Sequence, residues 1–442
     1  MERLKLFEID LIYFLLVIFT GFKVVSPCQL NVESPLPIFT KQFLTKKIVF
    51  KPHGASLQLQ PGESITAYCN IGIMYRYNQA SSNRYDYNFN GNGIRNQNLE
   101  VNTVEVICEA NNQIGIKGKL SSSSNQFTIY CASPSTYDLY ESKKALTNCE
   151  NYANYAIGVP LQTAGIENDI KAGICYDLDR FELKFVNFVA YLNSDVAVFD
   201  NNKQTSELSI DLDKKISSLT NYFAFMSDST FNESRDSFRI GNKLFNAFEF
   251  DLASLFQDEP LNTELKNFAY IFNIMWWRQL RQQNWRYFLD ALRARTQASK
   301  YLVYMGTYGN ATIPSAQGNC SSFQSEVVSV RKDKEAVSAP AYIWMYLKSL
   351  THADEQEIVV IAHNSPYVME PEHSEFCSVD LCDEVEWLQN SAFGNLRRLP
   401  TLGYTFCCRP EEVAKVIDYF PLPIDEIEIS SLTKNNSSAE KV

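Results

Sequence analysis

Apolar and polar residues alternate along much of the first half of the chain, and this spacing predicts β-strands. Ser56–Cys69 alternates around a Pro-Gly turn, which predicts two strands paired with each other. Tyr75–Asn98 is rich in Asn, Tyr, Ser and Gly, which predicts a long loop. Residues 29–195 are therefore expected to form a β-rich N-terminal lobe. Three further segments show the same period of two: Val101–Cys108, Gln126–Cys131 and Phe181–Leu192.

Beyond residue 195 the pattern becomes mixed. Ser206–Phe225 could hold a helix, and Tyr270–Met275 is suited to a buried strand. Strands interleaved with helices predict an α+β domain over residues 196–426. The polar, charged tail 427–442 is expected to be disordered. Three later apolar runs would complete a sheet: Tyr301–Met305, Ala341–Tyr346 and Glu357–Ala362.

One amphipathic helix stands out in this second half. Its apolar positions recur at helical spacing, and its opposite face is partly basic. An ordinary solvated face is the alternative interpretation of that basic stripe. The apolar face contains Trp285, Phe288, Leu289 and Leu292, and the opposite face contains Arg286, Asp290, Arg293 and Gln297.

The first residues predict export. Arg3 and Lys5 precede the apolar run Leu11–Phe19, which is too short to span a bilayer comfortably. We interpret residues 1–26 as a cleaved signal peptide, with a signal anchor as the alternative, and expect a secreted protein without a membrane association after cleavage. Five glycosylation sequons fit a secretory route: Asn232, Asn310, Asn319, Asn435 and Asn436.

Export changes the meaning of the 11 cysteines. None forms a zinc-binding pattern, so disulfides are expected, with at least one cysteine left over or pairing between chains. Cys320 and Cys377 are candidate disulfide halves before they are candidate nucleophiles. The net charge of −11 argues against a globally basic nucleic-acid-binding protein, so any such binding needs a local basic patch.

Four blocks of the sequence occur in a specific order: Asn284-Trp285 with Asp290-Ala291-Leu292-Arg293, Tyr304–Gly309, Pro340–Trp344 with Asn364–Tyr367, and Gly403–Cys408. Together they resemble the DNA/RNA non-specific endonucleases of the ββα-metal family, in particular its secreted arthropod branch. In that family Asn-Gly-Gly-Asn-Trp is followed by Glu-Asp-x-x-Arg. The resemblance implies a ββα-metal core, a central sheet flanked by helices.

The resemblance also implies a lost activity. The family uses a His as general base and an Asn-held Mg²⁺ to stabilise the reacting phosphate. Leu252 stands in the place of the His, Arg281 in that of the metal-binding Asn, and Leu289 in that of a Glu that orders metal-bound water. None of the 4 His residues lies between positions 200 and 300. We therefore expect no catalytic residue, no metal ligand and no cofactor, with Mg²⁺ only under the active-enzyme alternative below.

The same segment is rich in cations and aromatic rings. We expect sequence-independent binding of DNA or RNA through its arginines, with little or no hydrolysis. Of Trp276, Trp277 and Trp285, at least two are expected in the core. Two alternatives remain: an active Mg²⁺-dependent DNA/RNA endonuclease, and an inactive scaffold for an unknown protein partner. The predicted binding residues are Arg278, Arg281, Arg286, Arg293 and Arg295.

Other groups of residues give weaker evidence for a catalytic site. His352-Ala353-Asp354 and His363 lack a GxSxG nucleophile elbow. His363 ends a predicted strand, where a structural role is the simpler interpretation. No phosphate-binding glycine loop is present in the sequence.

Overall fold

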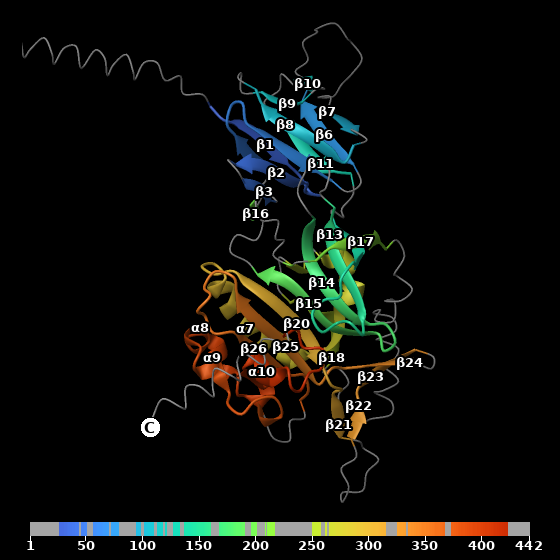
Figure 1. Cartoon of the computed structure of the whole chain (residues 1–442), viewed down its shortest axis with the longest axis vertical. Helices are drawn as coiled ribbons and strands as arrows, with labels where there is room; N and C mark the ends of the chain where they lie inside the picture. Colours follow the sequence, from blue (N-terminus) through green and yellow to red (C-terminus); the bar gives the residue numbers. More distant parts are fainter. Residues whose placement is uncertain are drawn as a thin grey trace, which may run out of the picture. The chain divides into compact units, whose positions relative to one another are not determined.

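The computed structural model divides the chain into two compact units, one from residues 1–136 and 195–201 and the other from residues 137–194 and 202–442 (Figure 1). We describe each by itself. The described residues are 26–43, 46–50, 56–69, 72–78, 94–98, 101–109, 113–117, 120–121, 127–132, 137–160, 168–190, 196–200, 208, 210–216, 250–257, 261–262, 265–314, 325–332, 335–366 and 373–422.

The first unit contains two sheets. The five-stranded sheet has the order β4-β1-β11-β6-β7, and the seven-stranded sheet has the order β10-β9-β8-β5-β2-β3-β16. The strands are β1 (Cys28–Val32), β2 (Ile38–Phe43), β3 (Lys46–Phe50), β4 (Ser56–Leu59), β5 (Ser64–Tyr68), β6 (Ile73–Asn78), β7 (Ile94–Asn98), β8 (Thr103–Cys108), β9 (Ile114–Ile116), β10 (Leu120–Ser121), β11 (Phe127–Cys131) and β16 (Val196–Asp200).

One apolar core joins these two sheets. Leu30 and Ile129 from the smaller sheet pack in the same cluster as Phe39 and Val106 from the larger one. Inward residues alternate with outward ones, as in β8, so each sheet buries one face. The disulfides Cys28–Cys108 and Cys69–Cys131 also connect the two sheets.

Two predictions in this unit are corrected. Ser56–Cys69 does form two strands around a turn at Gly62, but β4 pairs with β1 and β5 pairs with β2 and β8. The turn therefore passes from one sheet to the other, because each strand finds its partners far away in the sequence. The ends of the predicted loop Tyr75–Asn98 lie in β6 and β7, which pair with each other.

The second unit is built on a nine-stranded antiparallel sheet with the order β17-β12-β13-β14-β15-β20-β25-β26-β27. This confirms a mixed, strand-rich α+β fold and the three predicted late strands. Its strands are β12 (Asp138–Ser142), β13 (Ala153–Val159), β14 (Asp169–Asp177), β15 (Glu182–Ala190), β17 (Leu212–Lys215), β20 (Tyr301–Tyr308), β25 (Tyr342–Ser349), β26 (Ile358–His363) and β27 (Thr405–Cys408).

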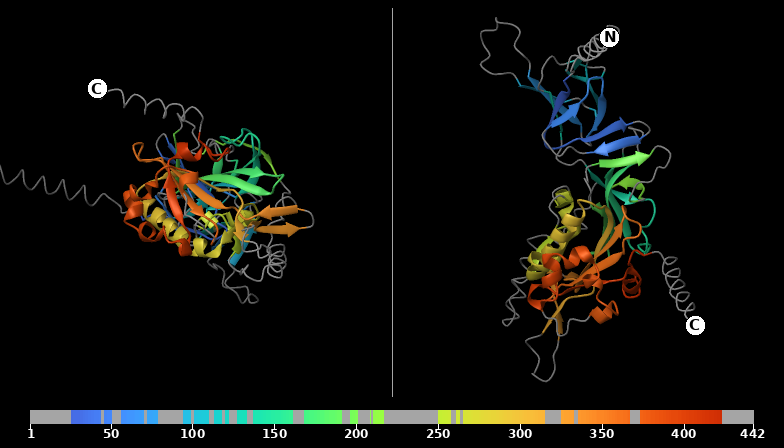
Figure 2. Two further views of the ribbon diagram at one scale, coloured as in Figure 1. Left: turned by 90° about the horizontal axis from the view of Figure 1, so that it is seen from below. Right: turned by 90° about the vertical axis from the view of Figure 1, so that its left-hand side faces the viewer.

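Both faces of this sheet are covered, because consecutive residues of β25 are buried instead of alternate ones. On one face Trp344 packs with Phe420 and Ile417 near the end of the described chain. On the other, Phe188 of β15 contacts Phe256, and the helices of residues 278–295 lie along this side (Figure 2).

Short elements complete the unit. Three two-stranded ribbons are formed by β18 (Phe250–Ser254) with β19 (Asn273–Trp277), β21 (Thr312–Pro314) with β22 (Ser325–Val327), and β23 (Ser329–Lys332) with β24 (Glu335–Ser338). The α-helices are α5 (Ala269–Phe272), α6 (Arg278–Gln282), α7 (Asn284–Arg295), α8 (Glu386–Gln389), α9 (Ala392–Leu396) and α10 (Pro410–Val413). The 3₁₀ turns are η4 (Lys266–Phe268), η5 (His373–Glu375), η6 (Leu381–Asp383) and η7 (Pro400–Leu402).

The division between the units differs from the boundary expected at residue 195. β12–β15 belong to the nine-stranded sheet, whereas β16 pairs with β3 in the first unit. Two local predictions also change. Residues 212–215, inside the predicted helix Ser206–Phe225, form β17 beside β12, and Tyr270–Met275 is split between α5 and β19. Residues 212–215 are a strand because they pair with β12 at the edge of the sheet, and helical propensity alone could not predict this pairing.

Five disulfides are present, which confirms that prediction and fits an oxidising compartment. The second unit contains Cys149–Cys175, Cys377–Cys408 and Cys382–Cys407. Cys320, the eleventh cysteine, lies outside the described residues. So do residues 1–25 of the predicted signal peptide, the tail 427–442 and every sequon except that of Asn310. Within the described ranges, no helix is both long and apolar enough to cross a membrane.

Candidate nucleic-acid interface

The predicted site lies on two antiparallel strands followed by two helices. β18 pairs with β19, and the chain passes directly from Trp277 into α6 and then α7. In α7 the buried residues are spaced for one helical face, which explains why this stretch is a helix. Arg293 and Arg295 occupy its last turn, where positively charged side chains interact favourably with the negative end of the helix dipole.

An ion-pair network centred on Asp251 joins β18 to α6. Arg278 donates from Nη2 to Oδ1 at 2.6 Å and from Nε to both carboxylate oxygens at 3.1 and 3.0 Å. Arg281 donates from Nη2 to Oδ2 at 2.8 Å and from Nη1 to Oε1 of Gln257 at 3.3 Å. Asp251 therefore holds both guanidinium groups in place, and neither is an isolated cation.

The electrostatics of Asp251 follow from this arrangement. Burial by itself raises the pKa of the carboxyl group, but the hydrogen bonds from Arg278 and Arg281 outweigh burial, and the pKa lies below its ordinary value. The same hydrogen bonds raise the pKa of Arg278 further. The Asp251 carboxylate and the Arg278 guanidinium group are thus charged at neutral pH.

Leu252 and Leu289 stand where the resemblance expects the catalytic His and the water-ordering Glu, and they do not face a common site with Arg281. Leu252 is half-buried in β18 opposite Met275, and Leu289 is 6% exposed in the apolar face of α7. Trp276, Trp277 and Trp285 are all buried, which confirms the expectation that at least two of them belong to the core. None of these three rings is available for stacking on a base.

Asn284, the first residue of α7, has a structural role that sequence reasoning missed. Its side chain is fully buried, and its Nδ2 donates to the carbonyl oxygens of Gly403 at 2.6 Å and Leu396 at 3.1 Å. Gly403 has a positive φ of 96°, and an added Cβ would lie 2.5 Å from Leu280. A glycine therefore allows the loop after α9 to approach α6, and the hydrogen bonds from Asn284 hold the loop in that position.

These residues do not fit a Mg²⁺ ion. Magnesium prefers several oxygen ligands in octahedral geometry, usually including carboxylates. Both oxygens of Asp251 already accept hydrogen bonds from arginine. Among the buried side-chain atoms described in residues 278–295, the one oxygen without a partner is Oδ1 of Asn284. A single buried amide oxygen is not a magnesium site.

The remaining predicted binding residues lie on α7, and two of them also meet acids. Nε of Arg286 lies 3.2 Å from Asp290, and both side chains are about half exposed at 48% and 51%. Nη2 of Arg295 lies 2.9 Å from Glu355, and its Nε donates to the hydroxyl of Tyr301. Arg293 is half-buried. The arginines thus gather on α6 and α7, but acids from other places pair with most of them. These acids are Asp251 of β18, Asp290 of α7 and Glu355.

Two other groups, the Asp380–Cys382–Cys407 cluster and His363, contain side chains of the types found in chemical sites. Asp380, Cys382 and Cys407 lie close enough to share a metal ion. However, the two cysteines form a disulfide, and the carboxylate accepts from two backbone N–H groups and from Arg397. His363 ends β26 as predicted, where burial lowers its pKa and Nδ1 lies 3.3 Å from the carbonyl of Ser365. Both groups are structural.

A scan against protein-family models and a search of curated proteins each return no match to this chain.

Proposed function

We propose that the second unit is a nuclease-like ββα fold that has lost phosphodiester hydrolysis and binds nucleic acid without sequence preference. On this proposal the protein is secreted and glycosylated, and its ligand is DNA or RNA. The observation that carries the proposal is the Asp251 network, in which Arg278 and Arg281 stand at the strand-to-helix junction. The resemblance places the metal ion of the family at this junction.

The succession of elements supports the fold assignment. β18, β19 and the α6–α7 helices follow one another as two antiparallel strands and a helical segment. A guanidinium group at the metal position supplies positive charge that is fixed to the protein, so phosphate can be bound there without an ion that activates water. Hydrolysis also needs a general base, and Leu252 cannot be one.

Exposed ion pairs do not prevent phosphate binding. The side chains of Arg278 and Arg286 are 40% and 48% exposed, and their carboxylate partners lie at the surface or close to it. Because exposed pairs contribute only about 0.2–1 kcal/mol, a phosphate can replace the carboxylate at low cost. Binding of this kind is weak and depends strongly on salt.

The neutralised arginines and the buried tryptophans also favour a second candidate function, a scaffold that binds a protein partner. Such a protein would have no measurable affinity for nucleic acid, and chemical crosslinking would capture a protein instead. The active-enzyme alternative predicts Mg²⁺-dependent cleavage of both DNA and RNA.

The test mixes the secreted chain with fluorescent single- and double-stranded DNA and RNA, with and without Mg²⁺. Shifted but uncut nucleic acid supports the proposal, and affinity should fall steeply between about 50 and 200 mM salt. Undetectable binding at about 50 mM salt, or binding that salt does not change, contradicts it. Shortened products would instead establish the enzyme.

A charge-reversed variant locates the binding surface. Arg286→Glu with Arg293→Glu changes two residues on the same face of α7 and leaves the Asp251 network intact. We expect affinity to fall by about tenfold or more and the salt slope to decrease by about 2. The matched control, Arg409→Glu with Lys415→Glu, changes two exposed residues elsewhere by the same charge. Equal losses in the two variants would exclude α7 as the interface.

A further inference from the structure

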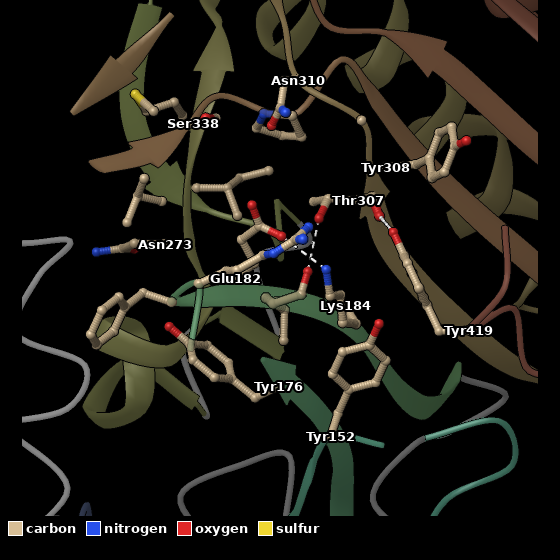
Figure 3. Close-up of a pocket in the computed structure, with 18 of the residues that line it drawn as sticks. Tyr152, Tyr176, Glu182, Lys184, Asn273, Thr307, Tyr308, Asn310, Ser338 and Tyr419 are labelled. Carbon is tan, nitrogen blue, oxygen red and sulfur yellow. Dashed lines mark hydrogen bonds and ion pairs between the residues drawn. The ribbon is translucent and has the colours of Figure 1, made fainter. Parts of the chain in front are cut away.

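A pocket of about 270 Å³ opens in the second unit and shares no lining residue with the Asp251 network (Figure 3). Its walls come from the β14–β15 turn, β19, the end of β20 and residues 418–419. The volume lies just below the range of about 300–1,000 Å³ that is typical of small-molecule sites. The pocket therefore suits a group of the size of one sugar ring and not a polymer.

The lining carries no net charge. Its acids are Glu182 and Asp418, and its bases are Arg180 and Lys184. Lys184 is already paired, because its Nζ lies 2.9 Å from Glu182 and 3.4 Å from Asp177, and its side chain is only 8% exposed. A charged ligand thus finds no complementary field here, and a neutral ligand fits the pocket better.

Several polar groups of the lining have no protein partner. Within the described part of the chain, no hydrogen bond or ion pair involves the side chains of Arg180, Asn273 or Asp418. Among the same residues, the hydroxyl groups of Tyr152 and Tyr308 make no hydrogen bond either. A guanidinium group only donates, a carboxylate only accepts, and amide and hydroxyl groups do both. This mixture suits a neutral molecule that carries several hydroxyl or amide groups, as a sugar does.

A glycosylation sequon stands at the rim of this pocket. Asn310 lines the pocket, and both Asn310 and Thr312, which completes the sequon, are exposed. Between them Ala311 is buried, and its backbone N–H donates to the carbonyl oxygen of Ala339 at 2.7 Å. In Figure 3, Asn310 and Tyr152 lie at opposite ends of the pocket. A sugar attached to Asn310 would therefore begin beside the polar groups that have no partner.

We propose that Asn310 is N-glycosylated and that the first sugar of its glycan, an N-acetylglucosamine, occupies this pocket. The inference rests on the secretory route in the proposed function and not on nucleic-acid binding. The donor in that route is an oligosaccharide linked to a lipid pyrophosphate, and a transferase of the host cell catalyses the transfer. Nδ2 of Asn310 bonds to C1 of the sugar and releases one proton. The bond from C1 to the pyrophosphate oxygen breaks, and its electrons leave with the pyrophosphate.

The covalent bond makes even a weak sugar site effective. A sugar fixed to Asn310 meets the pocket at an effective concentration on the order of millimolar. Its hydroxyl and acetamide oxygens accept from Arg180 and Asn273, and its hydroxyl groups donate to Asp418. Because the pocket exists only in the folded chain, a sugar bound in it stabilises the fold.

Peptide mass spectrometry of the full chain, secreted from cultured eukaryotic cells, tests the modification. Peptides are treated with peptide-N-glycosidase in heavy-oxygen water, which converts each glycosylated Asn to a labelled Asp. We expect the label at Asn310. Label at other sequons but not at Asn310 would overturn this inference and leave the proposed glycosylation standing. A secreted chain without any glycan would contradict both.

Two substitutions at Thr312 test whether the sugar enters the pocket. Thr312→Ala destroys the sequon and Thr312→Ser keeps it, so the melting temperature of Thr312→Ala should lie about 2 °C or more below that of Thr312→Ser. This difference should shrink by about half or more in an Asp418→Ala background, which removes a partner of the sugar. It should stay unchanged in Asp354→Ala, which removes an exposed acid outside the pocket. Equal differences in the two backgrounds would show that the glycan acts outside the pocket, and the proposal would be wrong.

Hydrogen exchange of the folded parent gives a second measurement, which decides the matter if Thr312→Ala is not secreted. Once peptide-N-glycosidase has removed the glycan, amides of residues 180–184 and 307–310 should exchange faster, since the sugar no longer covers them. Amides of the first unit serve as the control and should not change. Unchanged exchange in both pocket segments would contradict the proposal.

Discussion

Replacing Asp251 by Asn tests the central ion-pair network. The carboxylate binds Arg278, whose side chain is 40% exposed, and Arg281, whose side chain is 22% exposed. The more exposed pair is screened by solvent and contributes about 0.5 kcal/mol, and the more buried one about 1–1.5 kcal/mol. Because Asn retains one acceptor oxygen, we expect the free energy of unfolding to fall by about 1–2 kcal/mol at neutral pH.

The pH dependence gives a sharper test. In the folded protein the pKa of Asp251 lies below the ordinary value of an aspartate side chain. The stability that the carboxylate contributes is therefore fully present above about pH 4 and is lost as the pH falls through the lowered folded value. The difference between the parent and Asp251→Asn should accordingly shrink in strongly acidic solution.

Denaturant unfolding with the disulfides intact measures this difference. All 5 tryptophans lie between Trp276 and Trp387, so their fluorescence reports the second unit alone. Asp290→Asn is the control, since its pair with Arg286 is half exposed and should contribute less than about 0.5 kcal/mol. A variant as stable as the parent at neutral pH, or a loss that persists unchanged to about pH 2, would refute the reasoning.

Two further predictions concern stability near the α6–α9 region. Arg397 is fully buried and bridges Asp380 and Asp383. Arg397→Met should therefore lower the free energy of unfolding in denaturant by about 3 kcal/mol. A decrease below about 1 kcal/mol would show that the bridge is dispensable. Gly403→Ala should lower stability by at least about 2 kcal/mol, because it adds a Cβ 2.5 Å from Leu280 at a positive φ, whereas Gly62→Ala, with a φ of 81° and open space, should cost only about 1 kcal/mol. Thermal unfolding of each variant checks this pair, and equal costs would mean that the contact with Leu280 relaxes freely.

The arginine cluster shows that the sequence predicted the cations but not the acids that pair with them. Within residues 278–300 the sequence contains a single acid, Asp290, which predicts a strongly basic surface. The structure brings in Asp251, 27 residues before Arg278, and Glu355, 60 residues after Arg295. Both acids lie outside any local window, so only the packing of β18 and of the loop before β26 could reveal them.

Local patterns alone determined the strands β8, β11 and β15, the helix α7 and the burial of Trp285 on its apolar face, because side-chain periodicity depends on near neighbours in the chain. The order of the sheets, the cysteine pairs and the contacts of the Lys184 side chain were decided by the tertiary structure. Tyr152 and Tyr419 are far apart in the sequence, yet both rings face one ammonium group. Contacts of that kind depend on how non-local strands pair, and no periodic pattern in the sequence encodes them.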